Sequence, residues 1–393
     1  MIRNSEAVSF GLTGTGRRAA AIASVASAFP ERSYTQHEVG ELLGLENTVV
    51  RKLLRSPHIR KRHLYLPPAD ARTGRVAEES VLDLQAKFRD GALDIGVRAI
   101  RGALGAASLT PADVDYILCV TSTGFMVPGL SSLLSRELGF DPKVLRADLV
   151  GMGCNAGLNG LNPLVQWISN YPDRVALLVC CEINSAMYVV DQTPRTGIVN
   201  SLFGDGAAAA VLSSGAFSAD GASGGAGASG GTGFLPWVLD FESFCIPEQW
   251  AGMRFDWDAG AGKWSFYVDR DIPQVIGANV REPVTRLLAR NGLSFGDVRH
   301  WVLHTGGGAV IDAVMAGLDL TEWDVRHTRS VLRDYGNISS GSFLVSLERL
   351  LADGSVRDGD LGVMVTMGPG AQIETALISF AAGGTGSGPA RSA

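Results

Sequence analysis

Three residues that lie far apart in the chain carry groups suited to acyl-transfer chemistry: Cys154, His304 and Asn337. Cys154 ends a glycine-rich turn, GMGC, directly before the helix-like run NAGLNGLNPLVQWISN. A helix dipole favours a thiolate at the helix N-terminus, and the thiolate is the nucleophilic form of cysteine. The turn therefore predicts a nucleophile, although Cys154 by itself could equally be a small buried core residue.

The two candidate partners of Cys154 follow much later in the chain. His304 ends the apolar run WVLH and precedes Thr305 and three glycines, which let the backbone approach a ligand closely. Asn337, in YGNISSGS, offers amide donors suited to a developing oxyanion. Each alone could have a simpler role, a histidine that caps a turn or an asparagine that caps a helix. Only the three together predict nucleophilic catalysis.

An internal repeat explains how these residues could meet. LTPADVDYILCVTSTG (109–124) resembles LSFGDVRHWVLHTGGG (293–308), and each segment follows a helical pattern. The similarity continues, because GMGCNAGLNGL (151–161) corresponds to RDYGNISSGSFLVSL (333–347) and so places Cys154 opposite Asn337. Helix, turn, buried strand and tight loop occur twice, which predicts a duplicated α/β fold. Equivalent loops of the two halves are then expected to converge near a pseudo-twofold axis.

Composition sets the domain boundaries. We expect one half at residues 20–216 and the other at 235–380. Between them, residues 217–234 consist mostly of Gly, Ala and Ser and predict a flexible loop, and a similar tail at 381–393 is expected to be disordered.

Charge and cysteine content exclude several classes of protein. The chain has 393 residues, 46% of them hydrophobic, and a net charge of −6, which argues against a nucleic-acid-binding protein. Five scattered cysteines form neither a disulfide framework nor a metal-binding motif, so we expect a cytoplasmic location and no metal site. No apolar run is long enough to predict a transmembrane helix.

Four motifs give the chain a family resemblance: SLFGDGAAAAVL, HTGGGAVID, YGNISSG and MGPG. Together with the Cys, His and Asn set, they resemble the type III polyketide synthases, the chalcone synthase-like branch of the thiolase superfamily. The resemblance covers about residues 20 to 380. It implies the α/β thiolase fold, a duplicated five-layer αβαβα architecture, and a homodimer.

The resemblance also implies residue roles. Cys154 would hold the growing acyl chain as a thioester, while His304 and Asn337 stabilise the enolate that malonyl-CoA leaves on losing carbon dioxide. No metal or redox cofactor is implied. Further residues come from the family's motifs: the pocket residues Phe203, Phe266 and Met187, and the CoA contacts Arg55, Arg60 and Ala309.

Longer blocks, including DLVGMGCNAGLNGLN and DVRHTRSVLRDYGNISSGSFL, resemble the branch of antibiotic pathways that forms 3,5-dihydroxyphenylacetyl-CoA. They imply four malonyl-CoA molecules as starter and extenders, with possible accessory dehydratase or cyclase proteins. Thr305, Met187 and Met367 depart from the common motifs of the family and argue against a chalcone-type starter.

Four alternatives remain open at this point. The chain could make another product, such as tetrahydroxynaphthalene or an alkylresorcinol. It could be a ketoacyl-ACP synthase III that takes malonate from an acyl carrier protein. A non-catalytic partner subunit would be expected to lose the nucleophile, and a papain-like hydrolase would carry a local cysteine signature that is absent.

Overall fold

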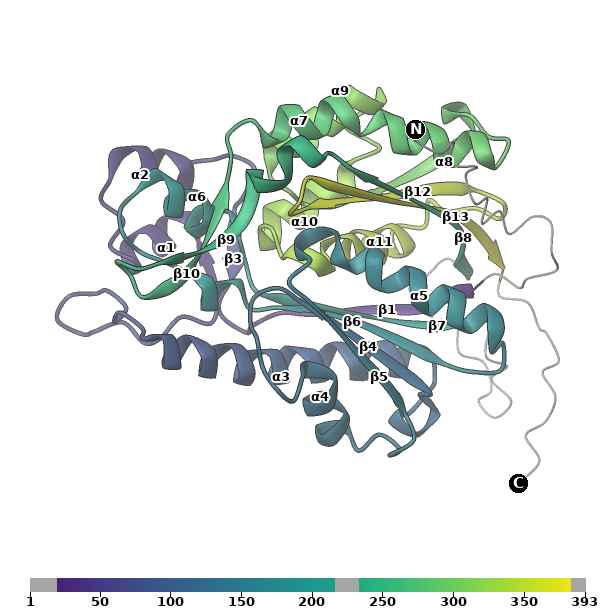
Figure 1. Ribbon diagram of the computed structural model, residues 1–393, viewed down its shortest axis with the longest axis horizontal. Helices are drawn as coiled ribbons and strands as arrows, with labels where there is room; N and C mark the ends of the chain where they lie inside the picture. The colour runs from purple at the N-terminus through teal and green to yellow at the C-terminus, as the bar shows by residue number, and fades with distance from the viewer. Residues whose placement is uncertain (1–19, 216–232, 383–393) are drawn as a thin grey trace, which may run out of the picture.

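The computed structural model describes residues 20–215 and 233–382 (Figure 1). Residues 217–232 of the predicted loop and 383–393 of the predicted tail lie outside the described residues. The elements of the N-terminal half are β1 (Ala20–Ala28), β2 (Ser33–Thr35), α1 (Gln36–Leu42), α2 (Thr48–Leu54), β3 (Lys61–His63), α3 (Val81–Ala106), η1 (Pro111–Asp113), β4 (Tyr116–Thr121), α4 (Leu130–Leu138), β5 (Leu145–Val150), η2 (Gly153–Asn155), α5 (Ala156–Asn170), β6 (Ala176–Glu182), η3 (Asn184–Met187), α6 (Pro194–Leu202) and β7 (Gly206–Ser213).

The C-terminal half repeats much of this order. Its elements are β8 (Phe234–Cys245), η4 (Pro247–Gly252), β9 (Met253–Asp258), β10 (Lys263–Val268), α7 (Ile272–Asn279), α8 (Arg281–Arg290), η5 (Phe295–Asp297), β11 (Val298–Leu303), α9 (Gly308–Leu318), α10 (Arg326–Tyr335), η6 (Ser339–Gly341), α11 (Ser342–Ala352), β12 (Leu361–Gly368) and β13 (Gln372–Ala382).

The strand order shows the duplication directly. The main sheet runs β11-β12-β13-β8-β1-β7-β6-β4-β5, so β8, β13, β12 and β11 mirror β1, β7, β6 and β4. Pairing also matches, because β11–β12 and β4–β6 are parallel whereas β12–β13 and β6–β7 are antiparallel. The halves are not separate sheets: Ala20 and Ala21 of β1 pair with Val238 and Trp237 of β8 and join them into one.

Three hydrophobic cores separate five layers, as the α/β duplication predicts (Figure 1). In β6, Leu178 and Cys180 face the middle core whereas Val179 and Cys181 face the core under α3, the two-residue alternation of a strand buried on both faces. The middle core contains α5 and α11, which the two halves of the sheet enclose. The helix α5 follows Cys154 and α11 follows Asn337, so both candidate loops lie at the ends of central helices.

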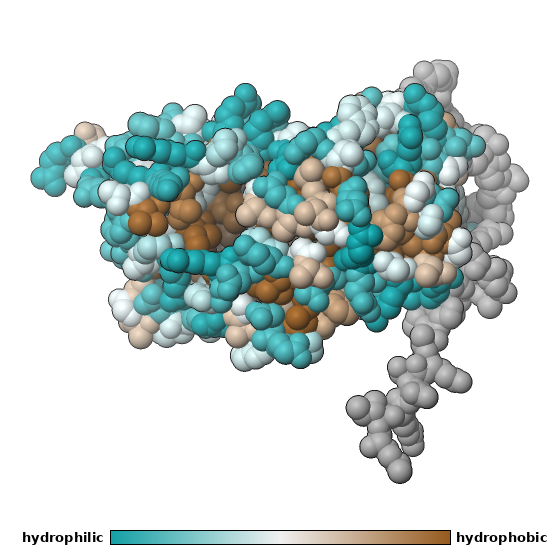
Figure 2. All heavy atoms as spheres, turned by 90° about the horizontal axis from the view of Figure 1, so that it is seen from above, coloured by the Kyte–Doolittle hydropathy of each residue, from teal (hydrophilic) through white to brown (hydrophobic). Residues whose placement is uncertain are grey.

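The two copies of the predicted helix–turn–strand unit begin alike. Thr110 and Asp113 form a capping box before β4, and Ser294 and Asp297 form the same box before β11. Each capping box begins a short 3₁₀ turn that leads into a buried parallel strand. The outer face seen in Figure 2 is largely hydrophilic with hydrophobic patches between, as expected for layers that bury one side. Within residues 20–215 and 233–382, no helix is long and apolar enough to cross a membrane.

The hairpin of β9 and β10 is longer than the β2–β3 pair of the N-terminal half and covers the end of the molecule that contains Cys154. Exposure differs along the hairpin. Phe255 and Phe266 turn inward, whereas Trp257 and Trp264 form an edge-to-face pair in which both rings are about half exposed, at 53% and 52%. The hairpin therefore supplies the apolar cover of a pocket.

Candidate active site

The turn that carries Cys154 requires its glycines. Gly153 has a φ of +78°, and a Cβ at this position would lie 2.2 Å from Pro369 in the MGPG loop. Only glycine tolerates both the left-handed backbone and this close approach. The Gly153 N–H donates to Ser122 Oγ at 2.7 Å, which anchors the turn to the end of β4. The GMGC and MGPG motifs are thus two sides of one packing contact.

The turn η6 brings Asn337 and Ser339 to the same place. Ser339 Oγ donates a hydrogen bond to Cys154 Sγ at 3.4 Å. Asn337 Oδ1 accepts the Ser339 N–H at 2.8 Å and holds Ser339 at a φ of +55°. Because its oxygen is occupied, the NH₂ group of Asn337 is the part left for Cys154 or a ligand. Ser339 is not among the residues that the sequence singles out, although it lies two residues after Asn337.

The backbone of Asn337 pairs with that of Phe203. The Asn337 N–H donates to the Leu202 carbonyl at 2.9 Å, and the Gly204 N–H donates to the Asn337 carbonyl at 3.0 Å. The end of α6 therefore sets the position of Asn337. The duplication thus brings Cys154, Asn337 and Phe203 together from three separate parts of the chain.

His304 lies at the end of β11, as the sequence predicts. Its N–H donates to the Val365 carbonyl at 2.9 Å, and its Nδ1 lies 2.6 Å from Ser342 Oγ at the start of α11. A direct hydrogen bond to Cys154 is not among the contacts of the described residues. Burial lowers the pKa of His304 to about 3, so the imidazole is neutral at physiological pH.

The surroundings of Cys154 oppose the thiolate that its helix start favours. Burial is the largest influence and raises the pKa of its thiol to about 12, while hydrogen bonds from Ser339 and Asn337 oppose that rise. The buried carboxyl group of Glu182 raises it further. The dipole of a helix start is outweighed here by the loss of water around the sulfur. Both pKa shifts favour a neutral thiol and a neutral imidazole.

This protonation state predicts slow alkylation of Cys154 by iodoacetamide at neutral pH. A raised pKa makes the thiolate a small fraction, so the rate should rise roughly tenfold per pH unit from pH 6 to 9. Peptide mass spectrometry distinguishes Cys154 from the exposed Cys245. A rate that is already constant between pH 6 and 8 would instead show an ion pair with His304 and would contradict the neutral state.

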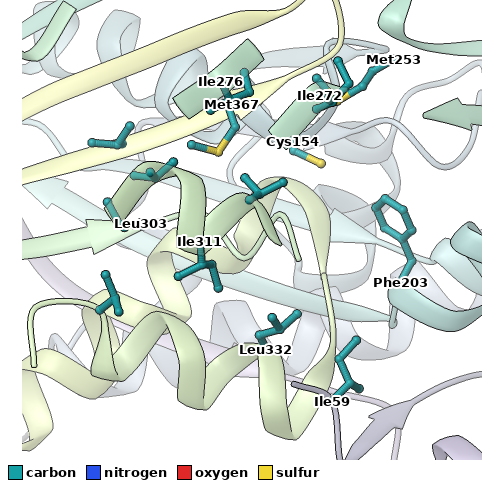
Figure 3. Close-up of a cluster of buried hydrophobic side chains, with 14 of the residues drawn as sticks. Ile59, Cys154, Phe203, Met253, Ile272, Ile276, Leu303, Ile311, Leu332 and Met367 are labelled. Carbon is teal, nitrogen blue, oxygen red and sulfur yellow. The ribbon is translucent and has the colours of Figure 1, made fainter. Parts of the chain in front are cut away.

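A narrow pocket opens above the sulfur, and we call it the catalytic pocket. Its lining includes Cys154, Met187, Phe203, Phe255 and Phe266. The rings of Phe203 and Phe266 pack edge to face at 5.6 Å, and Phe255 lies 4.8 Å from Phe266. Figure 3 shows Cys154 among apolar side chains, with the Phe203 ring turned toward it. The three pocket residues chosen from the sequence thus lie together around the thiol.

A buried carboxyl group links the two turns beneath the pocket. Glu182, at the end of β6, accepts hydrogen bonds from the Ser122 N–H at 2.9 Å, Thr123 Oγ at 2.9 Å and Ser340 Oγ at 2.6 Å. Burial raises its pKa. Ser122 in turn contacts Gly153, so Glu182 fixes both the nucleophile turn and η6. In the sequence, Glu182 could have been found as a polar residue at the end of a strand-like apolar run.

The residues chosen as CoA contacts lie on the surface. Arg55 and Arg60 are exposed, Arg60 with its guanidinium 3.5 Å from Asp334, and Ala309 is exposed in the first turn of α9. The segment that contains both arginines reaches α9, because a Cβ on Gly308 would lie 2.3 Å from the His58 ring. The three residues therefore share one region, away from the lining of the catalytic pocket.

The family profile for the N-terminal domain of chalcone and stilbene synthases matches residues 17–216, and that for their C-terminal domain matches residues 260–381. The chain belongs to this family. Among its relatives, the 3,5-dihydroxyphenylacetyl-CoA synthase of Streptomyces toyocaensis is 47% identical over 91% of this chain and 90% of its own. That of Amycolatopsis orientalis is 46% identical over 91% and 93%.

Family members with solved structures share the fold. The 1,3,6,8-tetrahydroxynaphthalene synthase of Streptomyces coelicolor, a bacterial type III polyketide synthase, superposes with a TM-score of 0.80 at 27% identity over 92% of this chain and 99% of its own. PKS-I of the brown alga Ectocarpus siliculosus gives 0.80 at 25% identity over 92% and 98%. The predicted family and fold class are confirmed, and the chain is an enzyme of the type III polyketide synthase family.

Proposed function

We propose that this enzyme builds 3,5-dihydroxyphenylacetyl-CoA from four malonyl-CoA molecules by decarboxylative condensation on Cys154. The observation that carries the proposal is the catalytic pocket, where Cys154 accepts a hydrogen bond from Ser339 beneath Phe203 and Phe266. The product is taken from the relatives that are 46–47% identical over nine tenths of the chain.

Loading begins with a proton transfer. Cys154 holds its proton in the free enzyme, and the neutral imidazole of His304 is the base we assign to accept it. The sulfur attacks the thioester carbonyl of malonyl-CoA, the bond from that carbon to the CoA sulfur breaks, and CoA leaves as a thiol with the proton. Ser342 faces Nδ1, so Nε2 is the nitrogen left for this transfer.

Extension uses His304 again, now together with Asn337. A second malonyl-CoA loses carbon dioxide, and its thioester oxygen becomes an enolate oxygen that the amide of Asn337 and His304 stabilise. For this step the neutral imidazole carries its proton on Nε2, and Ser342 Oγ donates to Nδ1. The apolar wall of Phe203 and Phe266 favours loss of the charged carboxylate as neutral carbon dioxide. The enolate carbon then attacks the carbonyl of the Cys154 thioester, the bond from that carbon to the Cys154 sulfur breaks, and the lengthened chain is carried on CoA until it is loaded onto Cys154 again. This scheme uses thioesters and side chains alone, without a metal or redox cofactor.

Arg55 and Arg60 are proposed to bind the CoA phosphates. The backbone at Ala309 is proposed to contact the pantetheine arm. Their support is their position, since a segment with two exposed cations contacts the glycine-rich start of α9. We place the enzyme in the cytoplasm, because the free thiol of Cys154 requires a reducing compartment.

We propose that the enzyme forms a homodimer by pairing of its β5 strands. This strand ends the nine-stranded sheet with β4 as its neighbour, and it exposes Leu145 at 52% and Val150 at 46%. An open strand edge pairs readily with another strand, and a twofold axis would pair β5 with its own copy. We expect light scattering to give twice the chain mass, and Leu145→Lys with Val150→Lys to give the monomer. A wild-type monomer would contradict this proposal.

The test of function is incubation of the purified enzyme with malonyl-CoA alone, followed by mass spectrometry. A dihydroxyphenylacetyl species, linked to CoA or hydrolysed, is the expected result. A naphthalene would retain the chemistry but overturn the product, and a 31% identical relative is a tetrahydroxynaphthalene synthase. A linear tetraketide would require an accessory dehydratase or cyclase. No product without an acyl carrier protein or another starter would contradict the proposal.

A further inference from the structure

A larger chamber adjoins the catalytic pocket. It has a volume of about 430 Å³, within the range of small-molecule sites. Its walls come from α3, the loop after β4, the end of β5 at Val150, η3 and the β9–β10 hairpin. Ser122, Thr123, Met187 and Phe255 line both the chamber and the catalytic pocket. A chain that grows from Cys154 past these four residues would therefore enter the chamber.

The chamber is apolar with a single cation. Of the described residues that line it, Lys263 is the one charged side chain, among residues such as Leu84, Phe88 and Trp264. The Lys263 side chain is only 10% exposed, and it begins β10, three residues before Phe266. A mostly buried ammonium group in an apolar wall is costly unless a carboxylate approaches it.

The partner that Lys263 has within the chain is weak. Its Nζ lies 3.3 Å from Glu78 Oε1, in a side chain that is 87% exposed. Lys263 and Leu84 also line a neighbouring pocket with Glu78, so the amine lies in the wall between that pocket and the chamber. An ion pair with so exposed a carboxylate contributes little, because water and salt compete for it. A carboxylate that arrives inside the chamber is better shielded and would compete well with Glu78.

We propose that Lys263 binds the terminal carboxylate of a chain primed by malonyl-CoA and so selects a dicarboxylic starter. The inference rests on the proposed function, in which malonyl-CoA serves as both starter and extender. Loading exchanges one thioester for another and leaves the malonyl carboxylate intact. The two carboxylates then meet different surroundings. Phe203 and Phe266 favour loss of carbon dioxide from the extender, whereas the ammonium of Lys263 holds the carboxylate of the starter during chain extension, and that carboxylate leaves as carbon dioxide at ring closure.

The test is a competition between two starters. The enzyme receives malonyl-CoA and hexanoyl-CoA together, and mass spectrometry gives the ratio of malonyl-primed to hexanoyl-primed products. In Lys263→Met and Lys263→Gln this ratio should fall about 10- to 100-fold, the scale for removing a hydrogen bond to a charged group. Lys263→Arg should keep the ratio within about threefold, because it retains the cation.

Two matched variants separate substrate binding from a structural ion pair. Glu78→Gln removes the protein partner of Lys263, so it should keep or raise the malonyl-primed share. Lys87→Met removes a similarly buried lysine, paired with Glu79, that does not line the chamber, and should leave the ratio unchanged.

The outcomes distinguish this inference from the proposed function. An unchanged ratio in both neutral Lys263 variants would overturn it, and so would an equal fall in Glu78→Gln and Lys263→Met. Hexanoyl-primed product in the same tube shows that each variant is folded and active. A wild-type enzyme that extends neither starter would contradict the proposed function itself.

Discussion

The Cys154→Ala variant is expected to lose condensation of malonyl-CoA by about 10³- to 10⁶-fold, the scale on which a removed nucleophile acts. The thioester cannot form without the sulfur, and no other thiol lines the catalytic pocket in the described part of the chain. Alanine removes only the sulfur beside an existing hollow, so the free energy of unfolding should change little. Product formation is measured by mass spectrometry and folding by thermal unfolding.

The same variant should keep one partial reaction. His304 and Asn337 remain in place, so malonyl-CoA should still lose carbon dioxide and give acetyl-CoA. Cys119→Ala is the matched control, because it makes the same change in a buried strand outside the site and should leave condensation intact. Condensation in Cys154→Ala at more than a tenth of the wild-type rate would overturn the mechanism.

The second large effect is expected from Asn337→Asp. The carboxylate keeps an oxygen for the Ser339 N–H, so the turn should survive, but it replaces the amide donor with an acceptor. Loss of one oxyanion donor predicts a fall of about 10²- to 10³-fold in malonyl-CoA decarboxylation, and His304→Ala should give a similar loss. The measurement is the rate of carbon dioxide release from malonyl-CoA.

Ser339→Ala is the control for this series. It removes the hydroxyl group that donates to Cys154 but leaves the Asn337 amide in place, so it should affect loading more than decarboxylation. If Asn337→Asp released carbon dioxide at the wild-type rate, the amide would not be an oxyanion donor. The residue would then act only as the cap of η6.

Much of the fold was predictable because it follows local patterns that occur twice. Two capping boxes, Thr110–Asp113 and Ser294–Asp297, each begin a short turn with hydrogen bonds within four residues. A buried strand follows each turn. Such contacts depend on sequence spacing alone. The glycines around Cys154 and His304 likewise indicate tight turns, because glycine readily adopts the backbone angles that such turns need. Pairing of β1 with β8 was not predicted, because strand neighbours far apart in sequence leave no local signal.

The duplicated α/β fold, the family, and the loops that carry Cys154, His304 and Asn337 could thus be predicted from the amino-acid sequence. These properties are encoded in motifs and periodicity. The surroundings of each group depend on the folded chain: Ser339 beside the thiol, Ser342 on the imidazole, and Lys263 in the chamber wall. The folded chain also raises the pKa of Cys154, because burial by side chains from distant segments opposes the effect of the helix dipole.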